Sequence, residues 1–228
     1  GAPTESADVN RGMPSIHDDV PAAWRAALVS GGVVLTHKTR GAHLERLPSG
    51  AGFILLVRHP ADAVVSDARF FALTQLDGYL AKEGVPSSES RPEHIEQLMS
   101  MYLVSVLQTG SVPKQRRLGF GSWGEHATSW LSARTEGPSV VLRYEDLQRA
   151  PHRELGRLCR FLGLDAPPDR IDAAIAGSDL AAMRRMQERE IAHQVPGRFY
   201  EERHKGAYAA GLRFVDRGLT GQGQRLPE

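Results

Sequence analysis

Three short apolar runs, Val33–Thr36, Phe53–Val57 and Val140–Tyr144, limit most strongly how this chain can fold. They lack the apolar–polar alternation of a half-exposed strand, so we expect three buried strands. Helical spacing of apolar residues marks the segments between and after them: 21–30, 60–71, 91–110, 122–134, 150–164, 167–177 and 178–190. Strands that alternate with helices predict a three-layer α/β fold, with a doubly wound, mainly parallel sheet flanked by helices.

Length and composition narrow the class of protein further. A chain of 228 residues is expected to form a single domain, 1–228, with a polar start at 1–13. Segments 74–90 and 193–228 resist assignment, and we expect the first to be a surface segment on the substrate side. The net charge of +1 gives no indication of nucleic-acid binding, and no apolar run reaches the roughly 18 residues of a membrane span. The single cysteine, Cys159, excludes an internal disulfide.

The second apolar run ends on a charge, Arg58, and Pro60 then fits the first turn of a helix. A helix N-terminus offers unpaired N–H groups to an anion, and a guanidinium matches a phosphate in shape. Ser66 follows in the opening turns of that helix and carries a hydroxyl. An anion site explains the pattern, and so does a structural pairing of Arg58 with Asp62 or Asp67.

The stretch LLVRHPADAVVSDARFF resembles the 3′-phosphate-binding signature of sulfotransferases that use 3′-phosphoadenosine 5′-phosphosulfate (PAPS). The resemblance implies the P-loop nucleotide-kinase-like sulfotransferase fold. It also implies that Arg58 and Ser66 hold the ribose 3′-phosphate. His59 departs mildly from the family, which often has Asn or Asp at this place.

Gly121–Pro151 resembles the family's helix–strand unit, which ends in Tyr-Glu-Asp-Leu. The resemblance implies that Tyr144 lies near the adenine, and a Tyr at a strand's carboxyl end is well placed to pack on a base. A core tyrosine is the alternative. Trp123, His126 and Trp130 in the same stretch are interpreted as packing residues.

Two later segments also resemble the family. Ser178–Met186 is similar to the segment that closes over the adenine, which implies roles there for Ser178 and Met183; Leu180 stands where an aromatic residue is usual. Glu202–Gly211 is similar to the C-terminal Arg-Lys-Gly loop that also grips the 3′-phosphate. The residues implied there are Arg203, His204, Lys205 and Gly206. An ordinary solvated, charged turn remains the alternative for this segment.

The resemblance implies that His37, in a Thr-His context after the first run, is the base that takes the acceptor proton. An ordinary imidazole titrates at about pH 6.5, which suits this role. Lys38 or Arg40 would neutralise the sulfonate. A shifted alignment would put Arg40 in the place of the base, and His43 and His17 are further candidates.

Members of this family open with a strand and a Lys-bearing glycine loop that wraps the 5′-phosphosulfate, and no such loop occurs in this sequence. We expect residues preceding Gly1 in the natural protein to supply it; a member that has lost activity is the alternative.

The implied reaction moves a sulfuryl group from PAPS to a hydroxyl, or in second place an amine. The acceptor would be a small molecule, carbohydrate or natural product, and the product adenosine 3′,5′-bisphosphate, with no metal. A non-catalytic module for 3′-phosphoadenosine nucleotides and a P-loop kinase relative are the alternatives. We expect a cytoplasmic protein, because PAPS is made inside cells and one cysteine suits a reducing compartment. A homodimer is a candidate assembly.

Overall fold

The structure is a computed structural model that describes residues 13, 26, 30–41, 51–135, 137–197 and 199–225. The described residues fall into two compact units. We call residues 59–108 and 176–225 the helical unit, and the described residues of 9–58 and 109–175 the sheet unit.

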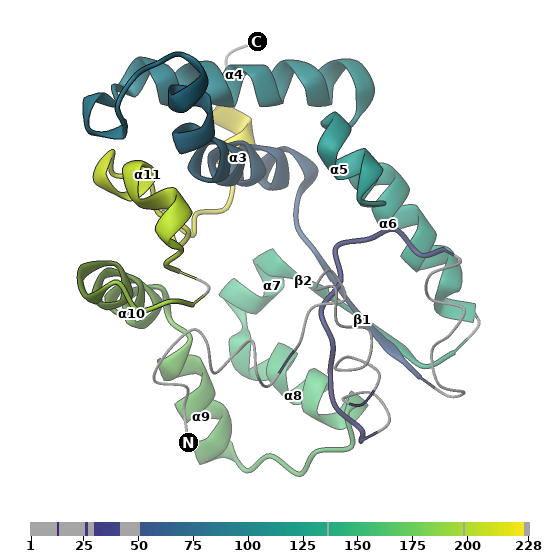
Figure 1. The fold of residues 1–228 in the computed structure, drawn as a ribbon. Coiled ribbons are helices and arrows are strands. Elements are labelled where there is room, and N and C mark those ends of the chain that lie inside the picture. The colour runs from purple at the N-terminus through teal and green to yellow at the C-terminus, as the bar shows by residue number, and fades with distance from the viewer. Residues whose placement is uncertain are drawn as a thin grey trace. The chain divides into compact units, whose positions relative to one another are not determined.

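The sheet unit is built on two parallel strands, β1 (Phe53–Val57) and β2 (Ser139–Arg143), which lie side by side in Figure 1. Their register pairs Phe53 with Ser139 and Val57 with Arg143. Trp130 packs on β1, with its ring centroid 5.1 Å from that of Phe53. The other elements are α5 (Pro113–Arg117), α6 (Trp123–Ser132), η3 (Ala133–Thr135), α7 (Tyr144–Arg149), α8 (Pro151–Phe161) and α9 (Pro168–Gly177), the last of which begins in this unit.

Two of the three expected strands form. β1 has the predicted bounds, whereas β2 begins and ends one residue early, so Tyr144 opens helix α7 instead of ending the strand. Val33–Thr36 forms no strand, and only Leu35 makes an isolated bridge. Individual hydrogen bonds, not a strand ladder, connect the next residues to the sheet unit. Trp130 Nε1 donates to the Lys38 carbonyl, and Thr39 N donates to Gly119 O. Of the helix expected at 21–30, only residues 26 and 30 are described.

The helical unit contains the longest described element, α3 (Pro60–Lys82). α3 runs well beyond the predicted end at residue 71 and takes in the first half of the unassigned segment 74–90. Its extension follows from leucines at helical spacing, Leu73, Leu76 and Leu80, all of which are buried. The other elements are η2 (Ser87–Glu89), α4 (Pro92–Thr109), α10 (Leu180–His193), η4 (Glu202–His204), α11 (Lys205–Ala209) and η5 (Gln222–Arg225).

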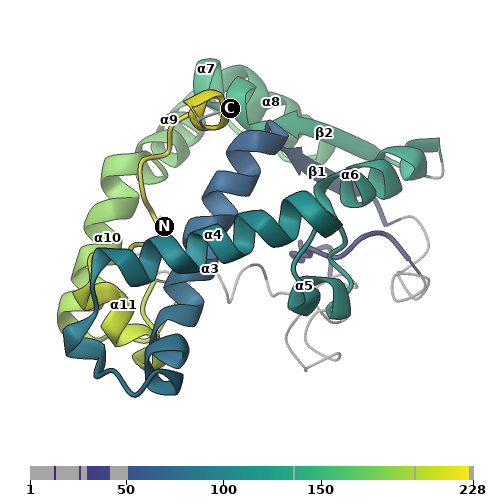
Figure 2. The same ribbon diagram turned by 90° about the horizontal axis from the view of Figure 1, so that it is seen from above.

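The core of the helical unit forms where α4 crosses α3 (Figure 2), with Leu98 of α4 packed in the leucine cluster of α3. Tyr200 and Tyr208 complete this core from the C-terminal region, with ring centroids 5.6 Å apart. None of the described helices is both long enough and apolar enough to cross a lipid bilayer.

Candidate functional site

The carboxyl ends of β1 and β2 bring two of the predicted nucleotide residues together. Because the strands are parallel and in register, the residues that follow them, Arg58 and Tyr144, leave the sheet at the same edge. The Arg58 guanidinium carbon lies 4.6 Å from the centroid of the Tyr144 ring, a cation–π distance. The Tyr144 hydroxyl accepts a hydrogen bond from Gln148 Nε2 at 2.8 Å. A cation and an aromatic ring that are 86 positions apart in sequence therefore lie together at the carboxyl edge of the sheet, an arrangement suited to a nucleotide.

The expected base, His37, is exposed, and its ring centroid lies 6.0 Å from that of Phe120. His126 of α6 is half-buried; burial lowers its pKa, and the charge of His37 lowers it further. The two imidazoles therefore lie within electrostatic reach of each other. His126, interpreted from the sequence as a packing residue, thus belongs to the surroundings of the expected base. His17 and His43 lie outside the described residues.

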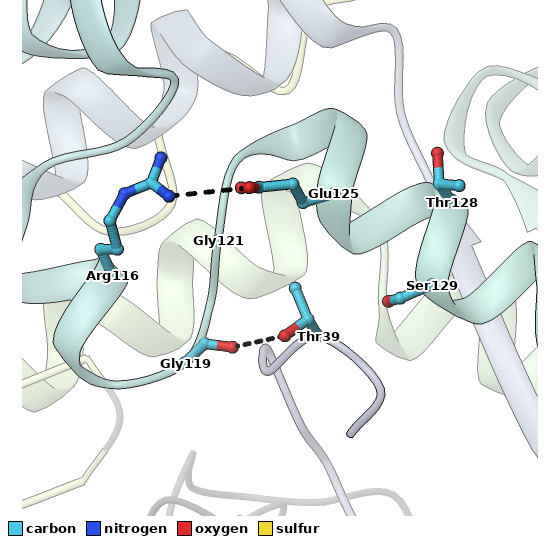
Figure 3. Close-up of a pocket in the computed structure, with 7 residues that line it drawn as sticks. All are labelled: Thr39, Arg116, Gly119, Gly121, Glu125, Thr128 and Ser129. Atoms are coloured by element: carbon cyan, nitrogen blue, oxygen red, sulfur yellow. Dashed lines mark hydrogen bonds and ion pairs between the residues drawn. The ribbon is translucent and has the colours of Figure 1, made fainter. Parts of the chain in front are cut away.

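An open pocket of about 440 Å³ is lined in part by Thr39, which is two residues after His37 in the chain (Figure 3). Among its lining residues, Thr39 Oγ1 donates to Gly119 O at 3.0 Å, and Arg116 and Glu125 form an ion pair at 3.6 Å. The Ser122 backbone N–H, followed by the Ser122 hydroxyl, lowers the pKa of Glu125, so this carboxylate stays charged. The residues that line the pocket are Thr39, Arg116, Gly119, Gly121, Glu125, Thr128 and Ser129, and most of the surface they present is apolar.

In the helical unit, Ser66 lies in the second turn of α3, whose N-cap is His59 and whose first residue is Pro60. The two carboxylates considered as partners for Arg58 have hydrogen bonds of their own here. Asp62 accepts from two backbone N–H groups, and Asp67 accepts from the Tyr102 hydroxyl.

The expected phosphate loop at Lys205–Gly206 packs on Asp77, toward the C-terminal end of α3. Asp77 accepts from the backbone N–H groups of Gly206 and Ala207, both at 3.1 Å. A Cβ on Gly206 would overlap the side chains of Asp77 and Ser87, so this glycine serves the close packing of α11 on α3.

The charged side chains of this loop already have acidic partners. Lys205 Nζ lies 2.9 Å from Glu202 and Arg203 lies 2.6 Å from Glu201, while His204 is buried against Tyr208. Ser66 is eleven residues before Asp77 on the same helix, which is roughly 16 Å of helical rise. The structure therefore does not bring Arg203, His204, Lys205 or Gly206 to Ser66.

A second glycine-bearing segment lies at the other end of α3. We call Arg213–Gly223 the C-terminal strap. Gly221 N donates to Asp62 Oδ2 at 2.6 Å, and Gly223 N donates to Asp62 Oδ1 at 2.7 Å. Asp62 lies in the first turn of α3, one turn before Ser66. The strap thus ends beside the helix N-terminus that carries the predicted anion site.

The strap also meets the predicted adenine segment. A Cβ on Gly218 would lie 3.1 Å from Leu180 Cδ1, at the start of α10, and Gly218 has a φ of 61°. Ser178 directly precedes Asp179, which caps α10 by accepting from Ala182 N at 2.6 Å, and Met183 is half-buried in the first turn. Sequence reasoning missed the strap. Its signal is Arg217–Gly218 with a second glycine three residues on, a tighter spacing than that of Gly206 and Gly211.

The comparisons with known proteins assign this chain to a family. The family described as "Sulfotransferase domain" matches residues 43–206, so the chain belongs to the sulfotransferase domain family. Mouse (Mus musculus) sulfotransferase 2A6 is 30% identical over 173 residues, covering 76% of this chain and 50% of the relative. A 3-alpha-hydroxysteroid sulfotransferase of Cavia porcellus is 29% identical over 136 residues, covering 60% of this chain and 39% of the relative. The chain spans about half the length of the mouse relative.

Solved structures agree on the fold. Mouse sulfotransferase SULT7A1 complexed with PAP superposes with a TM-score of 0.56 at 17% identity, over 86% of this chain and 59% of that one. Retinol dehydratase in a complex with retinol and PAP gives a TM-score of 0.53 at 17% identity, over 85% and 48%. The expected sulfotransferase-type α/β fold is therefore confirmed, although the described residues form only two of its strands.

Proposed function

We propose that this protein is a sulfotransferase that moves a sulfuryl group from PAPS to an acceptor hydroxyl, or in second place an amine, and releases adenosine 3′,5′-bisphosphate. The observation that carries the proposal is the Arg58–Tyr144 pair, in which two residues predicted to contact the nucleotide meet at the carboxyl edge of the sheet. Membership of the sulfotransferase family and PAP in the solved structures of similar fold support the same donor.

The proposed nucleotide contacts divide by chemistry. Arg58 and the Ser66 hydroxyl bind the 3′-phosphate, and Tyr144 packs on the adenine. Ser178 and Met183 line the base from the start of α10. Of the two C-terminal segments, the strap fits the 3′-phosphate role better than Lys205–Gly206, because it lies at the N-terminal turn of α3. Arg217 of the strap is exposed and forms no ion pair with a residue that the structure describes.

The chemical step needs a base at the acceptor and positive charge around the transferring group. We assign the base to His37, whose imidazole takes the proton as the acceptor oxygen attacks sulfur and the bond from sulfur to the phosphate oxygen breaks. Lys38, the next residue, neutralises charge on the sulfonate. Burial, followed by the charge of His37, lowers the pKa of the nearby His126, which makes His126 the weaker base of the two if His37 keeps an ordinary imidazole pKa.

The acceptor is proposed as a small molecule or a glycan. Relatives are named for hydroxysteroids, and one similar structure holds retinol, which favours an alcohol as the reacting group. The pocket of Figure 3 presents mostly apolar surface together with one ion pair, Arg116–Glu125, and hydroxyl side chains, which suits an apolar acceptor with a few polar groups. A cytoplasmic location, a homodimer and a metal-free reaction stay predictions.

Binding of nucleotides tests the class of protein. A ligand raises the melting temperature according to its concentration and affinity. We expect adenosine 3′,5′-bisphosphate to stabilise the protein well above ADP at equal concentration, because only the former carries a 3′-phosphate. Equal stabilisation by ADP would favour a P-loop kinase relative and overturn the proposal.

Transfer of labelled sulfate from PAPS to a panel of alcohols and amines tests the activity. His37→Ala should abolish turnover while the affinity for adenosine 3′,5′-bisphosphate stays within about twofold, because a lost base raises the barrier and not the binding energy. Lys82→Ala, at the far end of α3, is the control and should leave turnover unchanged. Bisphosphate binding without any turnover in the wild-type protein would favour the non-catalytic module.

A further inference from the structure

One buried side chain of α10 holds the backbone of the C-terminal strap. Gln187 is fully buried, and its amide pairs with both backbone groups of Val215. Gln187 Oε1 accepts from Val215 N at 2.7 Å, and Gln187 Nε2 donates to Val215 O at 3.2 Å. Only a primary amide offers an acceptor and a donor side by side in this way. Gln187 therefore satisfies both backbone hydrogen-bonding groups of Val215, as a neighbouring β-strand would do in a sheet.

The next residue of the strap, Asp216, is held from two helices. Arg184 of α10 donates to the Asp216 carbonyl, with Nε at 2.9 Å and Nη2 as a second donor. Arg69 of α3 forms an ion pair with the Asp216 carboxylate. On the far side of the turn, Asp62 accepts from Gly221 and Gly223. The five-residue turn from Arg217 to Gly221 is thus fixed at both ends.

The fixed turn carries an exposed cation. Arg217 lies between the anchor at Val215–Asp216 and the anchor at Gly221, and Gly218 packs on Leu180. A guanidinium binds a phosphate with the most energy when its backbone needs no further ordering, because ordering costs conformational entropy. The value of Arg217 as a ligand for an anion therefore depends on how firmly Val215 and Asp216 are held.

We propose that Gln187 is a positioning residue that places the Arg217–Gly221 turn against the 3′-phosphate of the nucleotide. The inference rests on the proposed function, in that a 3′-phosphoadenosine nucleotide is the ligand. Gln187 itself touches no ligand. It acts through the paired N–H and C=O of Val215.

The test compares two nucleotides that differ only in the 3′-phosphate. We expect Gln187→Met, which keeps the side-chain volume and removes both hydrogen bonds, to weaken adenosine 3′,5′-bisphosphate binding by about tenfold in titration calorimetry. Binding of adenosine 5′-monophosphate should change by less than about twofold, since that nucleotide has no 3′-phosphate for the turn to meet. The preference for the bisphosphate, a ratio of two affinities in one variant, should fall.

Gln75→Met is the matched control. Gln75 is a half-buried residue of α3 whose amide donates to Thr74 Oγ1 and not to the strap, so the preference for the bisphosphate should stay as in the wild type. A variant that weakens both nucleotides equally, or neither, overturns the positioning role. Failure of the wild-type protein to bind the bisphosphate at all points instead to failure of the proposed function.

A second variant covers the case in which Gln187→Met does not fold. Arg184 is exposed, so Arg184→Lys is expected to fold, and it keeps the charge while losing the two-pronged donation to Asp216 O. We expect a loss of about threefold in bisphosphate affinity, again with the monophosphate unchanged. An unchanged preference for the bisphosphate in Arg184→Lys would contradict the idea that the anchors of the strap set the position of the turn.

Discussion

Two glycine-bearing segments near the C-terminus pack on helix α3 through the same type of hydrogen bonding, yet only one of them lies where it could bind the nucleotide. At Lys205–Gly206 and at the strap, an aspartate of α3 accepts hydrogen bonds from two backbone N–H groups. The two aspartates, Asp77 and Asp62, are fifteen residues apart, which is roughly 22 Å along the helix. The strap meets the first turn of α3, where a helix has backbone N–H groups without an intrahelical acceptor, whereas the other segment meets a stretch inside the helix.

The difference shows that a Lys-Gly pair is weak evidence for a phosphate loop. Lys205 and Arg203 neutralise Glu202 and Glu201, and Gly206 is required by the contact of α11 with Asp77. Arg217 in the strap has no such acidic partner among the described residues. Two properties decide whether such a segment can bind a phosphate: where its backbone is anchored, and whether its cations already have acidic partners. A short sequence motif shows neither property.

The largest expected effect separates the two segments by binding. Arg217→Ala should weaken adenosine 3′,5′-bisphosphate by roughly 30-fold, because a charge-assisted contact to phosphate is lost. Lys205→Ala should change the same affinity by less than about threefold, since Lys205 serves Glu202. Titration calorimetry on both variants provides the measurement. A larger loss in Lys205→Ala than in Arg217→Ala would reverse the comparison.

The second effect concerns stability, and here the two segments should behave alike. Asp62→Asn and Asp77→Asn each replace one acceptor oxygen by an N–H₂ group that faces a backbone donor. Each change should lower the free energy of unfolding by about 2 kcal/mol, measured by urea denaturation. Only Asp62→Asn should also lower the preference for the bisphosphate over adenosine 5′-monophosphate. A selective loss in Asp77→Asn would argue that its segment meets the nucleotide.

The smallest expected effect is a pH dependence of stability that arises at the Lys205–Gly206 segment and not at the strap. Hydrogen bonds from the Tyr200 hydroxyl and from Lys205 lower the pKa of Glu202. A carboxylate with a lowered folded-state pKa stabilises the protein above its unfolded pKa of about 4.3, and this contribution is lost as the pH falls through the folded-state value. Denaturation between pH 3 and pH 6 should therefore show less acid sensitivity in Glu202→Gln than in the wild type. An identical pH profile would mean that the carboxylate contributes nothing to stability.

The local elements of this protein were largely predictable from its sequence. β1 has the predicted bounds because Phe53–Val57 is apolar throughout and Pro60 starts a helix. The sequence predicted α3 too short, because polar residues around Asp77 interrupt the apolar pattern there. The leucines of this stretch are buried only when α4 and α11 pack on them. Val33–Thr36 was predicted as a strand from its composition, but its backbone is described without ladder partners beyond one bridge. Strand formation needs a neighbour, and a run of apolar residues does not supply one.

The candidate site also has a part that the sequence predicted and a part that it did not. Arg58 and Tyr144 were predicted separately, each from a strand end, and the parallel register of β1 and β2 brings them to 4.6 Å. The strap was missed, because Asp62 and Gln187 reach it across 159 and 28 positions of sequence.

By itself, the sequence determined the class of protein, since the family signature lies in contiguous stretches such as LLVRHPADAVVSDARFF. Contiguous motifs fix local backbone shape and the order of the chemical groups along the chain. Only the tertiary structure decided which glycine segment lies at the N-terminus of α3 and which one serves packing at the other end. The physical reason is that a buried aspartate selects its backbone donors by position in space, and residues far apart in sequence compete for that position.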